Sequence, residues 1–324
     1  MPLSQADGSI LADDGRLIAR SLCKGDMLLA DVKPLVSRRI AAHVMTFVLL
    51  CILGFSVGGC SANITQASFF PDGSLAAPDA VLEVPAGYAA TNQLFDLGTL
   101  GKVRSVWLDN PASDTVIIYN AGNASFVDSA GTSRMAARLA SVTGADIILY
   151  DYPGRGGTTV PATIEAAAAL GPALVAQLKT AGWIGRGPVY VYGLSFGGGM
   201  AAAMVRSGGF AGLVIEGSAA DYLAIGRDFV PSIAKPFVKV RLAEQLRQFD
   251  YLGYVVAARA PVLLLSGTRD KVVRPKRMRE FADALTAGGV RVTFRPVPVG
   301  HGGALEAPEG RDALAVFMQG QPGT

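Results

Sequence analysis

The chain has 324 residues, of which 50% are hydrophobic and 17% are charged, and its formal net charge is +3. This composition excludes a disordered or coiled-coil protein, which would carry more charge and fewer apolar residues. The small net charge also argues against a nucleic-acid-binding protein, which must neutralise many phosphates. With two histidines and three cysteines, the sequence offers little from which a zinc site could be built. We therefore expect a packed globular domain without a metal.

The first distinctive segment is an apolar run at residues 44–58. A helix needs roughly 20 apolar residues to span a bilayer, so this run is short for a spanning helix. Arg38 and Arg39 precede the run and small residues follow it, which is the order found in a secretory signal. The pattern predicts that residues 1–59 are a targeting segment.

The apolar run leads into residues 57–60 (VGGC), which resemble the bacterial lipobox. In that motif the chain is cleaved before the cysteine, which then carries a lipid, so we expect lipidation at Cys60. Residues 60–85 are rich in Ala, Ser, Pro and Asp, and we expect them to tether a domain on the periplasmic side of a membrane. Ser61, where aspartate would favour the inner membrane, slightly favours the outer membrane. An uncleaved anchor helix, or secretion with a free Cys60, are the alternatives.

Beyond residue 86 the chain reads as one α/β domain. Residues 102–108 and 115–119, on either side of a turn at 110–113, predict an antiparallel hairpin. Continuous apolar runs, typical of strands buried on both faces, lie at 115–119, 146–150, 188–192, 212–216 and 261–265. Helical segments lie at 131–142, 161–182 (kinked or split at Gly171-Pro172), 196–206 and 275–287, followed by a strand near 290–297 and a helix at about 306–319. This alternation predicts a doubly wound, mostly parallel sheet over 86–324, with a short cap at about 217–260.

A Gly-x-Ser-x-Gly motif at residues 193–197 (GLSFG) lies between a predicted strand and a predicted helix. In this context the pattern predicts a nucleophile elbow, a sharp turn that exposes the hydroxyl of Ser195 beside the start of the helix. A second match at 54–58 (GFSVG) lies within the apolar run and has no strand before it. The alternative for Ser195 is a Gly-rich turn that only packs a helix against the sheet.

A serine nucleophile needs a base that takes its proton and an acid that orients the base. After Ser195 the chain presents Asp270 and then His301, each following a predicted strand, which is the chain order of an alpha/beta hydrolase. The alternatives are structural roles: Asp270 as a turn or helix-capping residue and His301 as a surface-loop residue. Glu216, at the end of another strand, is the rival acid, and we prefer Asp270 because its loop is nearer the expected position.

Two further motifs complete a family pattern. The strand at 115–119 is followed by AGNA at 121–124, and the strand at 146–150 by DYPGRG at 151–156. With the serine, aspartate and histidine in order, residues 100–320 resemble the alpha/beta-hydrolase superfamily, in its small-cap branch of serine-aminopeptidase-like and depalmitoylase-like proteins.

The resemblance implies a role for each residue of the site. It assigns Ser195 as nucleophile, Asp270 as acid and His301 as base, with the backbone N–H groups of Asn123 and Phe196 as the oxyanion hole. The sequence departs from the family pattern at Ala121, where a histidine usually braces the oxyanion loop. The departure puts the rigidity of that loop in question, although its backbone donors are retained.

The Gly-rich loop at 153–159 (PGRGGTT) partly resembles a dinucleotide-binding fingerprint. Its third glycine is replaced by Thr159, and the loop is not the first strand-to-helix turn of the chain. We therefore expect no nucleotide cofactor, and no other cofactor is implied.

Together these patterns predict a serine hydrolase of the esterase, lipase or thioesterase type, which cleaves a small-molecule or lipid ester through an acyl-enzyme on Ser195. A serine peptidase of the same fold is one alternative. A lipoprotein that only binds a lipid or a partner is another, and a cofactor-free perhydrolase is a third.

Basic residues are concentrated in the last third of the chain. Residues 227–279 contain twelve Lys or Arg against four Asp or Glu, and six of the twelve surround Asp270 in sequence: Arg269, Lys271, Arg274, Lys276, Arg277 and Arg279. One interpretation is a solvated helix face. The other is a positive rim that steers anionic esters or lipid headgroups toward Ser195.

Overall fold

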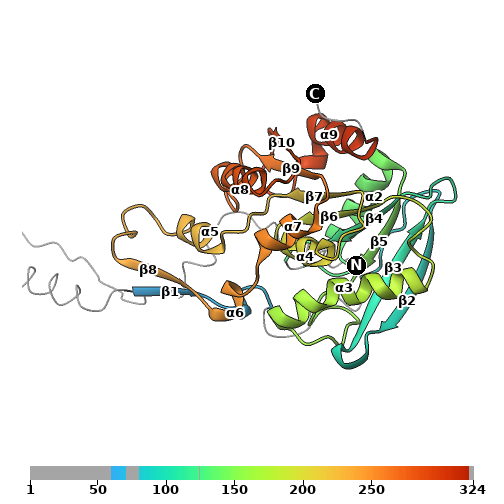
Figure 1. Ribbon diagram of the computed structural model, residues 1–324, viewed down its shortest axis with the longest axis horizontal. Helices are drawn as coiled ribbons and strands as arrows, with labels where there is room; N and C mark the ends of the chain where they lie inside the picture. The colour runs from blue at the N-terminus through green and yellow to red at the C-terminus, as the bar shows by residue number, and fades with distance from the viewer. Residues whose placement is uncertain (1–59, 71–79, 124, 321–324) are drawn as a thin grey trace, which may run out of the picture. The chain divides into compact units, whose positions relative to one another are not determined.

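A computed structural model of the chain describes residues 60–70, 80–123 and 125–320 (Figure 1). The predicted targeting segment, with its second Gly-x-Ser-x-Gly match at 54–58, lies outside the described residues. So do residues 71–79 of the predicted tether.

An eight-stranded sheet forms the centre of the domain, in the order β10-β9-β7-β6-β4-β5-β3-β2. The neighbours from β10 to β5 pair in parallel, whereas β3 is antiparallel to both β5 and β2. The strands are β2 (Ala89–Asp96), β3 (Lys102–Asp109), β4 (Val116–Asn120), β5 (Asp146–Tyr150), β6 (Val189–Leu194), β7 (Gly212–Glu216), β9 (Val262–Gly267) and β10 (Val292–Val297). The doubly wound, mostly parallel α/β fold predicted from the sequence is confirmed.

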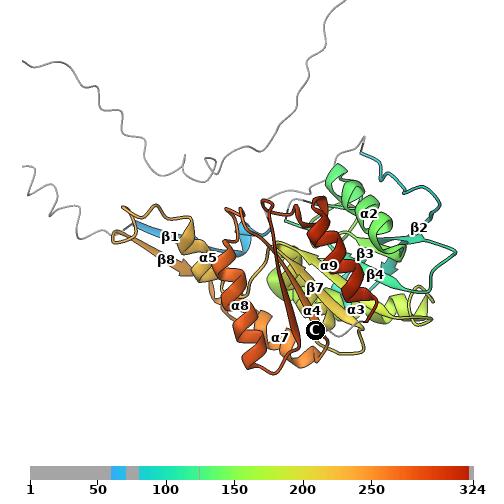
Figure 2. The same ribbon diagram turned by 90° about the horizontal axis from the view of Figure 1, so that it is seen from above.

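Helices cover both faces of this sheet (Figure 2). One face packs against α2 (Ala130–Thr143) and α9 (Pro308–Met318), and the other against α3 (Ile164–Thr180), α4 (Phe196–Val205), α7 (Tyr251–Ala258) and α8 (Pro275–Ala287). Because strand side chains alternate between the faces, Ile118 joins one buried cluster and its neighbour Ile117 the other. The continuous apolar runs of the sequence therefore serve two separate cores.

The predicted hairpin between 102–108 and 115–119 is wrong. β3 pairs with β2 and β5, while β4 pairs with β5 and β6, so β5 lies between the two segments. The reason is visible at Asp146, the first residue of β5. Its backbone N–H donates to the carbonyl of Thr115 (2.9 Å), and its carboxylate accepts from the N–H of Asn110 (2.8 Å). The turn at 110–113 therefore carries the chain across the end of β5.

The helix at 161–182 is not split at Gly171-Pro172. α3 is a single helix that contains Pro172, and it lies against α4 so closely that a Cβ at Gly171 would come within 2.8 Å of Met204. Burial of this face holds α3 together across the proline, which removes one helical hydrogen bond.

The cap between β7 and β9 consists of α5 (Tyr222–Asp228), β8 (Val238–Leu242), α6 (Glu244–Arg247) and α7. Its strand β8 pairs in parallel with β1 (Cys60–Ile64), with Cys60 opposite Val238 and Ile64 opposite Leu242. The first part of the predicted tether is therefore a strand of the cap, because it completes the ladder of β8. Within the described ranges, no helix is long and apolar enough to cross a bilayer.

Candidate active site

The topology brings the four predicted site loops to one edge of the sheet. Ser195 follows β6, the loop containing Asn123 follows β4, Asp270 follows β9 and His301 follows β10. These four strands are parallel, so their carboxyl ends meet at the same edge, which is where α/β folds build their sites.

Ser195 occupies a strained backbone position between β6 and α4. Its φ of 54° and ψ of −122° lie in a region that non-glycine residues rarely adopt. The backbone N–H of Ser195 donates to the carbonyl of Glu216 (2.9 Å), which holds the turn against β7. Gly193 and Gly197 are required for close approach, because a Cβ at Gly197 would come within 2.1 Å of the carbonyl oxygen of Asn120. These contacts explain the spacing of the motif.

Asp270 and His301 form a hydrogen-bonded pair, with His301 Nδ1 2.8 Å from Asp270 Oδ2. The Asp270 side chain is buried, and its other oxygen, Oδ1, accepts from the backbone N–H groups of Val272 (2.8 Å) and Val273 (2.9 Å). Three hydrogen bonds therefore fix the carboxylate. With Nδ1 engaged by Asp270, His301 has Nε2 left to face a reacting group.

Ser195 and His301 line the same cavity, which has a volume of about 440 Å³. Gly122 and Asn123, from the loop after β4, line it too. The structure thus brings the predicted serine, histidine and oxyanion loop around one cavity, and Asp270 lies directly behind the histidine.

Glu216, the rival acid, makes different contacts. Its Oε2 accepts from the hydroxyl of Tyr192 (2.6 Å) and its Oε1 from the backbone N–H of Ala304 (2.6 Å). Burial raises the pKa of this carboxyl, although the two hydrogen bonds oppose that shift. Glu216 therefore ties the segment after His301 to the central strands, whereas Asp270 bonds the imidazole.

Gly217 is a residue that the sequence patterns did not single out. Its φ is +53°, and a Cβ there would lie 3.1 Å from His301 Nδ1 and 3.2 Å from Asp270 Oδ2. A side chain at this position would crowd the hydrogen bond between the two residues. The one signal in the sequence that could have pointed to this role is the position of Gly217 directly after the strand that ends at Glu216.

The oxyanion loop is braced without the histidine that Ala121 replaces. The Tyr152 hydroxyl donates to the carbonyl of Ala121 (2.7 Å), and Arg155 Nη2 donates to Asn123 Oδ1 (2.6 Å). Asn123 Nδ2 in turn donates to the carbonyl of Ser68 (3.2 Å). Tyr152 and Arg155 both belong to the 151–156 motif. Their partners in the loop after β4 could not be predicted from the sequence, because these contacts form only when the two loops pack together.

Arg155 is a buried cation, and no carboxylate among the described residues lies within ion-pair distance of it. Burial lowers the pKa of its guanidinium. Nη2 also donates to the carbonyl of Phe69 (2.8 Å), so this side chain links Phe69 to Asn123 in the loop after β4.

Phe196 is the first residue of α4, and its ring is buried among other aromatic residues. Phe69 stacks on the ring at a centroid distance of 5.2 Å, and Phe70 meets it edge-on at 5.6 Å. The first N–H groups of a helix have no partner within it, so the start of α4 leaves the Phe196 N–H available to an anion. Phe69 and Phe70 thereby pack over the start of α4.

The positive groups at the cavity differ from those that the sequence suggested. None of the six basic residues around Asp270 lines the cavity, whereas Arg134 and Arg138 of α2 do. Arg277, for example, is held by Asp228 through two hydrogen bonds of 2.7 and 2.9 Å. Spacing of four residues on one helix face could have pointed to the α2 arginines.

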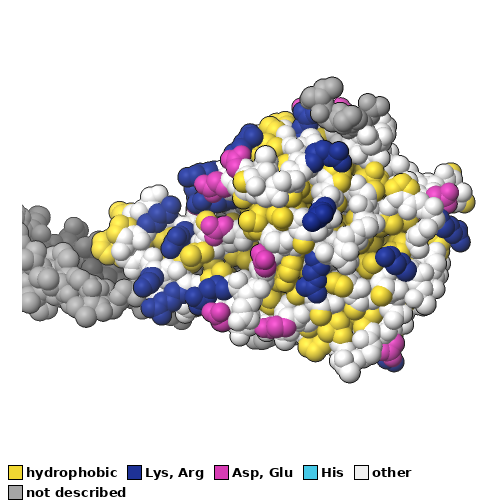
Figure 3. Space-filling model, viewed as in Figure 1, with side chains coloured by type: hydrophobic (Ala, Val, Ile, Leu, Met, Phe, Trp, Pro, Cys, Tyr) yellow, Lys and Arg dark blue, Asp and Glu magenta, His cyan; other side chains and the backbone are white. Residues whose placement is uncertain are grey.

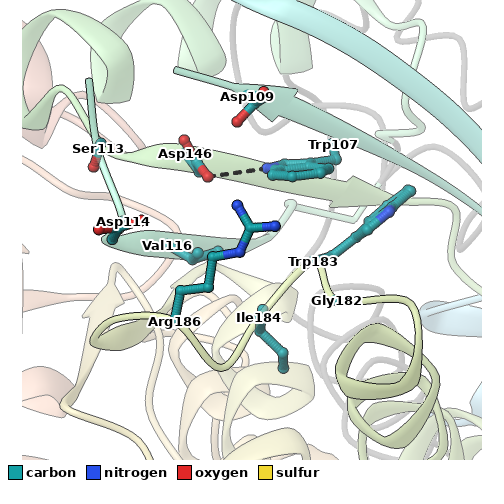
Figure 4. A pocket seen from close by; sticks show the side chains of 10 residues that line it. All are labelled: Trp107, Asp109, Ser113, Asp114, Val116, Asp146, Gly182, Trp183, Ile184 and Arg186. Carbon is teal, nitrogen blue, oxygen red and sulfur yellow. Dashed lines mark hydrogen bonds between the residues drawn. The ribbon is translucent and has the colours of Figure 1, made fainter. Parts of the chain in front are cut away.

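A second hollow lies elsewhere in the domain and is shown in Figure 4. Its lining includes Asp146, which accepts a hydrogen bond from Trp107 Nε1 (3.1 Å), and Arg186. Because Val116 and Asp146 begin their strands, this hollow lies at the sheet edge opposite Ser195. Its volume is about 20 Å³, which is room for roughly one water molecule.

Comparison with solved structures identifies similar folds. An esterase of Pyrococcus furiosus (Pf2001) aligns with a TM-score of 0.58 at 18% identity, covering 76% of this chain and 100% of the esterase. Carboxyl esterase 2 of Tuber melanosporum aligns with a TM-score of 0.55 at 15% identity, covering 78% and 94% of the two chains. An acylaminoacyl peptidase of Pyrococcus horikoshii gives 0.51 at 14% identity, covering 72% of this chain and 42% of the peptidase. At these identities the similarity concerns the fold alone.

Sequence comparison gives the family. No curated protein sequence matches the chain. Residues 121–299, more than half of the chain, match the family model described as the Alpha/beta hydrolase family, and this match spans the oxyanion loop, Ser195 and Asp270. The chain therefore belongs to the alpha/beta hydrolase family.

Proposed function

We propose that this protein is a serine hydrolase that cleaves carboxylic esters through a Ser195–Asp270–His301 triad. The observation that carries the proposal is the convergence of Ser195 and the hydrogen-bonded pair Asp270–His301 on one cavity. The strained backbone of Ser195 adds to it, because such strain is characteristic of a nucleophile elbow.

In the proposed mechanism His301 Nε2 takes the proton of Ser195 Oγ as that oxygen attacks the ester carbonyl carbon. The N–H groups of Asn123 and Phe196 stabilise the negative charge on the carbonyl oxygen. Collapse of the tetrahedral intermediate breaks the carbon–oxygen bond to the alcohol, which leaves with the proton from His301. Water, deprotonated by His301, then attacks the acyl carbon. The bond between that carbon and Ser195 Oγ breaks, Ser195 Oγ takes the proton back from His301, and the carboxylic acid leaves. Asp270 stabilises the imidazolium in both steps.

The charges at the cavity favour an ester over a peptide with a free amino terminus. An aminopeptidase needs an anionic group for the substrate ammonium. Among the lining residues, the carboxylate is that of Glu306, and it already accepts from Arg138 Nη2 (2.6 Å). Arg134 adds a further positive charge. An uncharged or anionic substrate therefore fits this lining better than a cationic one.

We further propose that the protein is a lipoprotein of the small-cap branch and acts on the periplasmic side of a membrane. The support is the order of Arg38–Arg39, the apolar run 44–58 and Cys60 in the sequence. The pairing of β1 with β8 is compatible with an anchor at Cys60, because Cys60 is the first residue of β1.

The test of the catalytic proposal is hydrolysis of a short p-nitrophenyl ester together with labelling by a fluorophosphonate probe. Ser195→Ala should abolish labelling and lower kcat/KM by roughly 10³-fold or more, and His301→Ala should lower kcat/KM nearly as much, because the triad acts as a unit. Ser125→Ala is the matched control, since Ser125 lines the same cavity without a predicted role.

The result also separates an enzyme from a protein that only binds lipid or a partner. Ser195→Ala activity within about tenfold of the wild type would remove Ser195 as the nucleophile. A wild-type chain that neither reacts with the probe nor cleaves the ester would favour the binding protein.

A further inference from the structure

The exposed end of the cap carries large apolar side chains. Ile233 is 86% exposed, Phe237 is 71% exposed and Phe229 is 49% exposed, and all three lie in the connection between α5 and β8. Isolated exposed apolar residues are common, but three within nine residues of chain form a local patch of the kind that marks interaction sites.

Basic residues accompany this patch. Arg227, Lys235, Lys239 and Arg241 are exposed, and among the described residues none of them has a carboxylate within 4.0 Å. Figure 3 shows dark-blue side chains gathered over the part of the surface that α5, β1 and β8 form. We call Arg227, Phe229, Ile233, Lys235, Phe237, Lys239 and Arg241 the cap tip.

The acidic residues nearest in sequence do not offset this charge. Asp228 is bonded to Arg277, which lowers the pKa of its carboxyl, and Glu244 lies 3.2 Å from Arg247 Nε. Asp221 caps the amino end of α5 by accepting from the N–H of Ala224 (2.8 Å). The cap tip therefore presents a net positive charge.

Side chains alternate between the two faces of β8, which places Lys239 and Arg241 on the exposed face. Val240 is buried on the side that α5 covers, where a Cβ at Gly226 would meet the side chains of Ile64 and Val240. Lys239 and Arg241, which flank Val240 along the strand, are exposed on the other side. β8 therefore has Val240 on its inner face and exposed basic side chains on its outer face.

The start of β1 lies at the same place. Cys60, the first residue of β1, pairs with Val238, which lies next to Phe237 and Lys239. The apolar run 44–58 ends two residues before Cys60. Because a residue spans at most about 3.6 Å, an anchor in this run or on Cys60 would hold the bilayer within about 10 Å of the start of β1.

We propose that the cap tip docks on the surface of a bilayer that contains anionic phospholipids. The aromatic and aliphatic side chains enter the boundary between headgroups and acyl chains, and the four basic side chains contact lipid phosphates. A bilayer is the occupant that the observations favour, since it explains the apolar residues, the positive charge and the adjoining anchor together. The proposal rests on the proposed membrane anchor but is independent of the chemistry at Ser195.

The experiment uses the full chain incorporated into vesicles of phosphatidylcholine, or of an equimolar mixture of phosphatidylcholine and phosphatidylglycerol. Ile233→Trp reports contact with lipid through quenching by brominated acyl chains, and the wild type gives the background from Trp107 and Trp183. Val316→Trp is the matched control, because Val316 is also an exposed apolar residue (48%) but belongs to α9. We expect a loss of fluorescence for Ile233→Trp, larger in the anionic vesicles, and none beyond background for Val316→Trp.

Reversing the charge of basic residues in the cap tip tests whether contact with lipid phosphates holds it on the bilayer. In the Ile233→Trp chain, Lys235→Glu, Lys239→Glu and Arg241→Glu together should remove the quenching in anionic vesicles while the chain still sediments with them through its anchor. Near-UV circular dichroism checks that the fold is retained.

Equal quenching of Ile233→Trp and Val316→Trp, or quenching that survives the charge reversal, would overturn the proposal. So would a shielded but unquenched emission from the tryptophan of Ile233→Trp, which would indicate a protein partner, and so would a full chain that does not sediment with either vesicle.

Discussion

Asp270 lies in the loop after β9 and Glu216 ends β7, both next to the candidate site, but their hydrogen bonds prepare them for different roles. Asp270 bonds His301 Nδ1, whereas Glu216 bonds Tyr192 and the backbone of Ala304. Asp270→Asn should lower kcat by roughly 10³- to 10⁴-fold, because the amide can no longer stabilise the imidazolium and can favour the wrong tautomer. Glu216→Gln should cost far less. Steady-state hydrolysis of the same ester by both variants gives the ranking, and the opposite ranking would move the acid to Glu216.

Glu216→Gln should also change how the stability of the fold depends on pH. Burial raises the pKa of Glu216, so the native protein holds this proton more tightly than the unfolded chain. The contribution of Glu216 to the free energy of unfolding is therefore largest below its ordinary pKa of about 4.3 and falls as pH rises through the raised pKa. Glu216→Gln should remove that decline, which urea unfolding across this pH window would measure.

A side chain at Gly217 should have two separate effects, one on the stability of the fold and one on the position of His301. Gly217→Ala should destabilise the fold by about 1–2 kcal/mol, because its φ is +53°, and should also lower kcat by displacing His301 from Asp270. Gly289→Ala is the control, since Gly289 has a φ of +79° and nothing within 4 Å of its Cβ position. We expect thermal unfolding to show similar losses for both variants and ester hydrolysis to suffer in Gly217→Ala alone. Equal kcat values would contradict the positioning role.

At the residue scale, the sequence predicted the groups that motifs mark and missed those that packing recruits. Ser195, Asp270 and His301 follow from chain order and loop position. The bracing role of Arg155 could not be read in this way, because its partners Asn123 and Phe69 meet only after three segments have packed together.

At the scale of elements, α2 supplies the positive charge of the cavity. Arg134 is exposed and lines the cavity, and Arg138, one turn later, is bonded to Glu306. Arg134→Gln should lower kcat/KM for an anionic ester by about two- to fivefold, relative to a neutral ester of the same size. The effect should shrink at high salt, because exposed charges are screened beyond about 8 Å at physiological ionic strength.

The control for Arg134→Gln is a substitution at Lys271, one of the six basic residues around Asp270 that the sequence suggested as a positive rim. Lys271 adjoins Asp270 in sequence and is exposed, but it does not line the cavity, so Lys271→Gln should leave the ratio of the two substrates unchanged. A change of the ratio in Lys271→Gln alone would restore the rim as the source of steering.

The elements themselves differ in how well their sequences predict them. The parallel strands are short apolar runs, and α8 begins at a proline, so both were placed within a few residues. β2 was missed because all but one of its residues are exposed, which leaves no apolar run. The partner of β3 could not be found either, since local sequence does not specify which strand lies between β3 and β4.

For the whole molecule, the proposed anchor and the hydrolase domain should be separable. Cys60→Ser should release the protein from membranes and leave hydrolysis of a soluble ester unchanged, because the cores, the cavity and the triad lie within the unit Gly59–Thr324. Fractionation of cells and an activity assay on each fraction give the result. Membrane retention of Cys60→Ser at the wild-type level would indicate an uncleaved helix at 44–58.

The pairing of β1 with β8 has a consequence for the order of folding. More than half of the chain lies between the two strands, so closing this loop costs more conformational entropy than closing any βαβ unit of the central sheet. Contacts between such distant segments form slowly. We therefore expect the β1–β8 ladder to assemble after the sheet, and until then β1 is an unpaired strand. Pulse-labelling hydrogen exchange during refolding would show protection of β1 and β8 arising together, in the last phase.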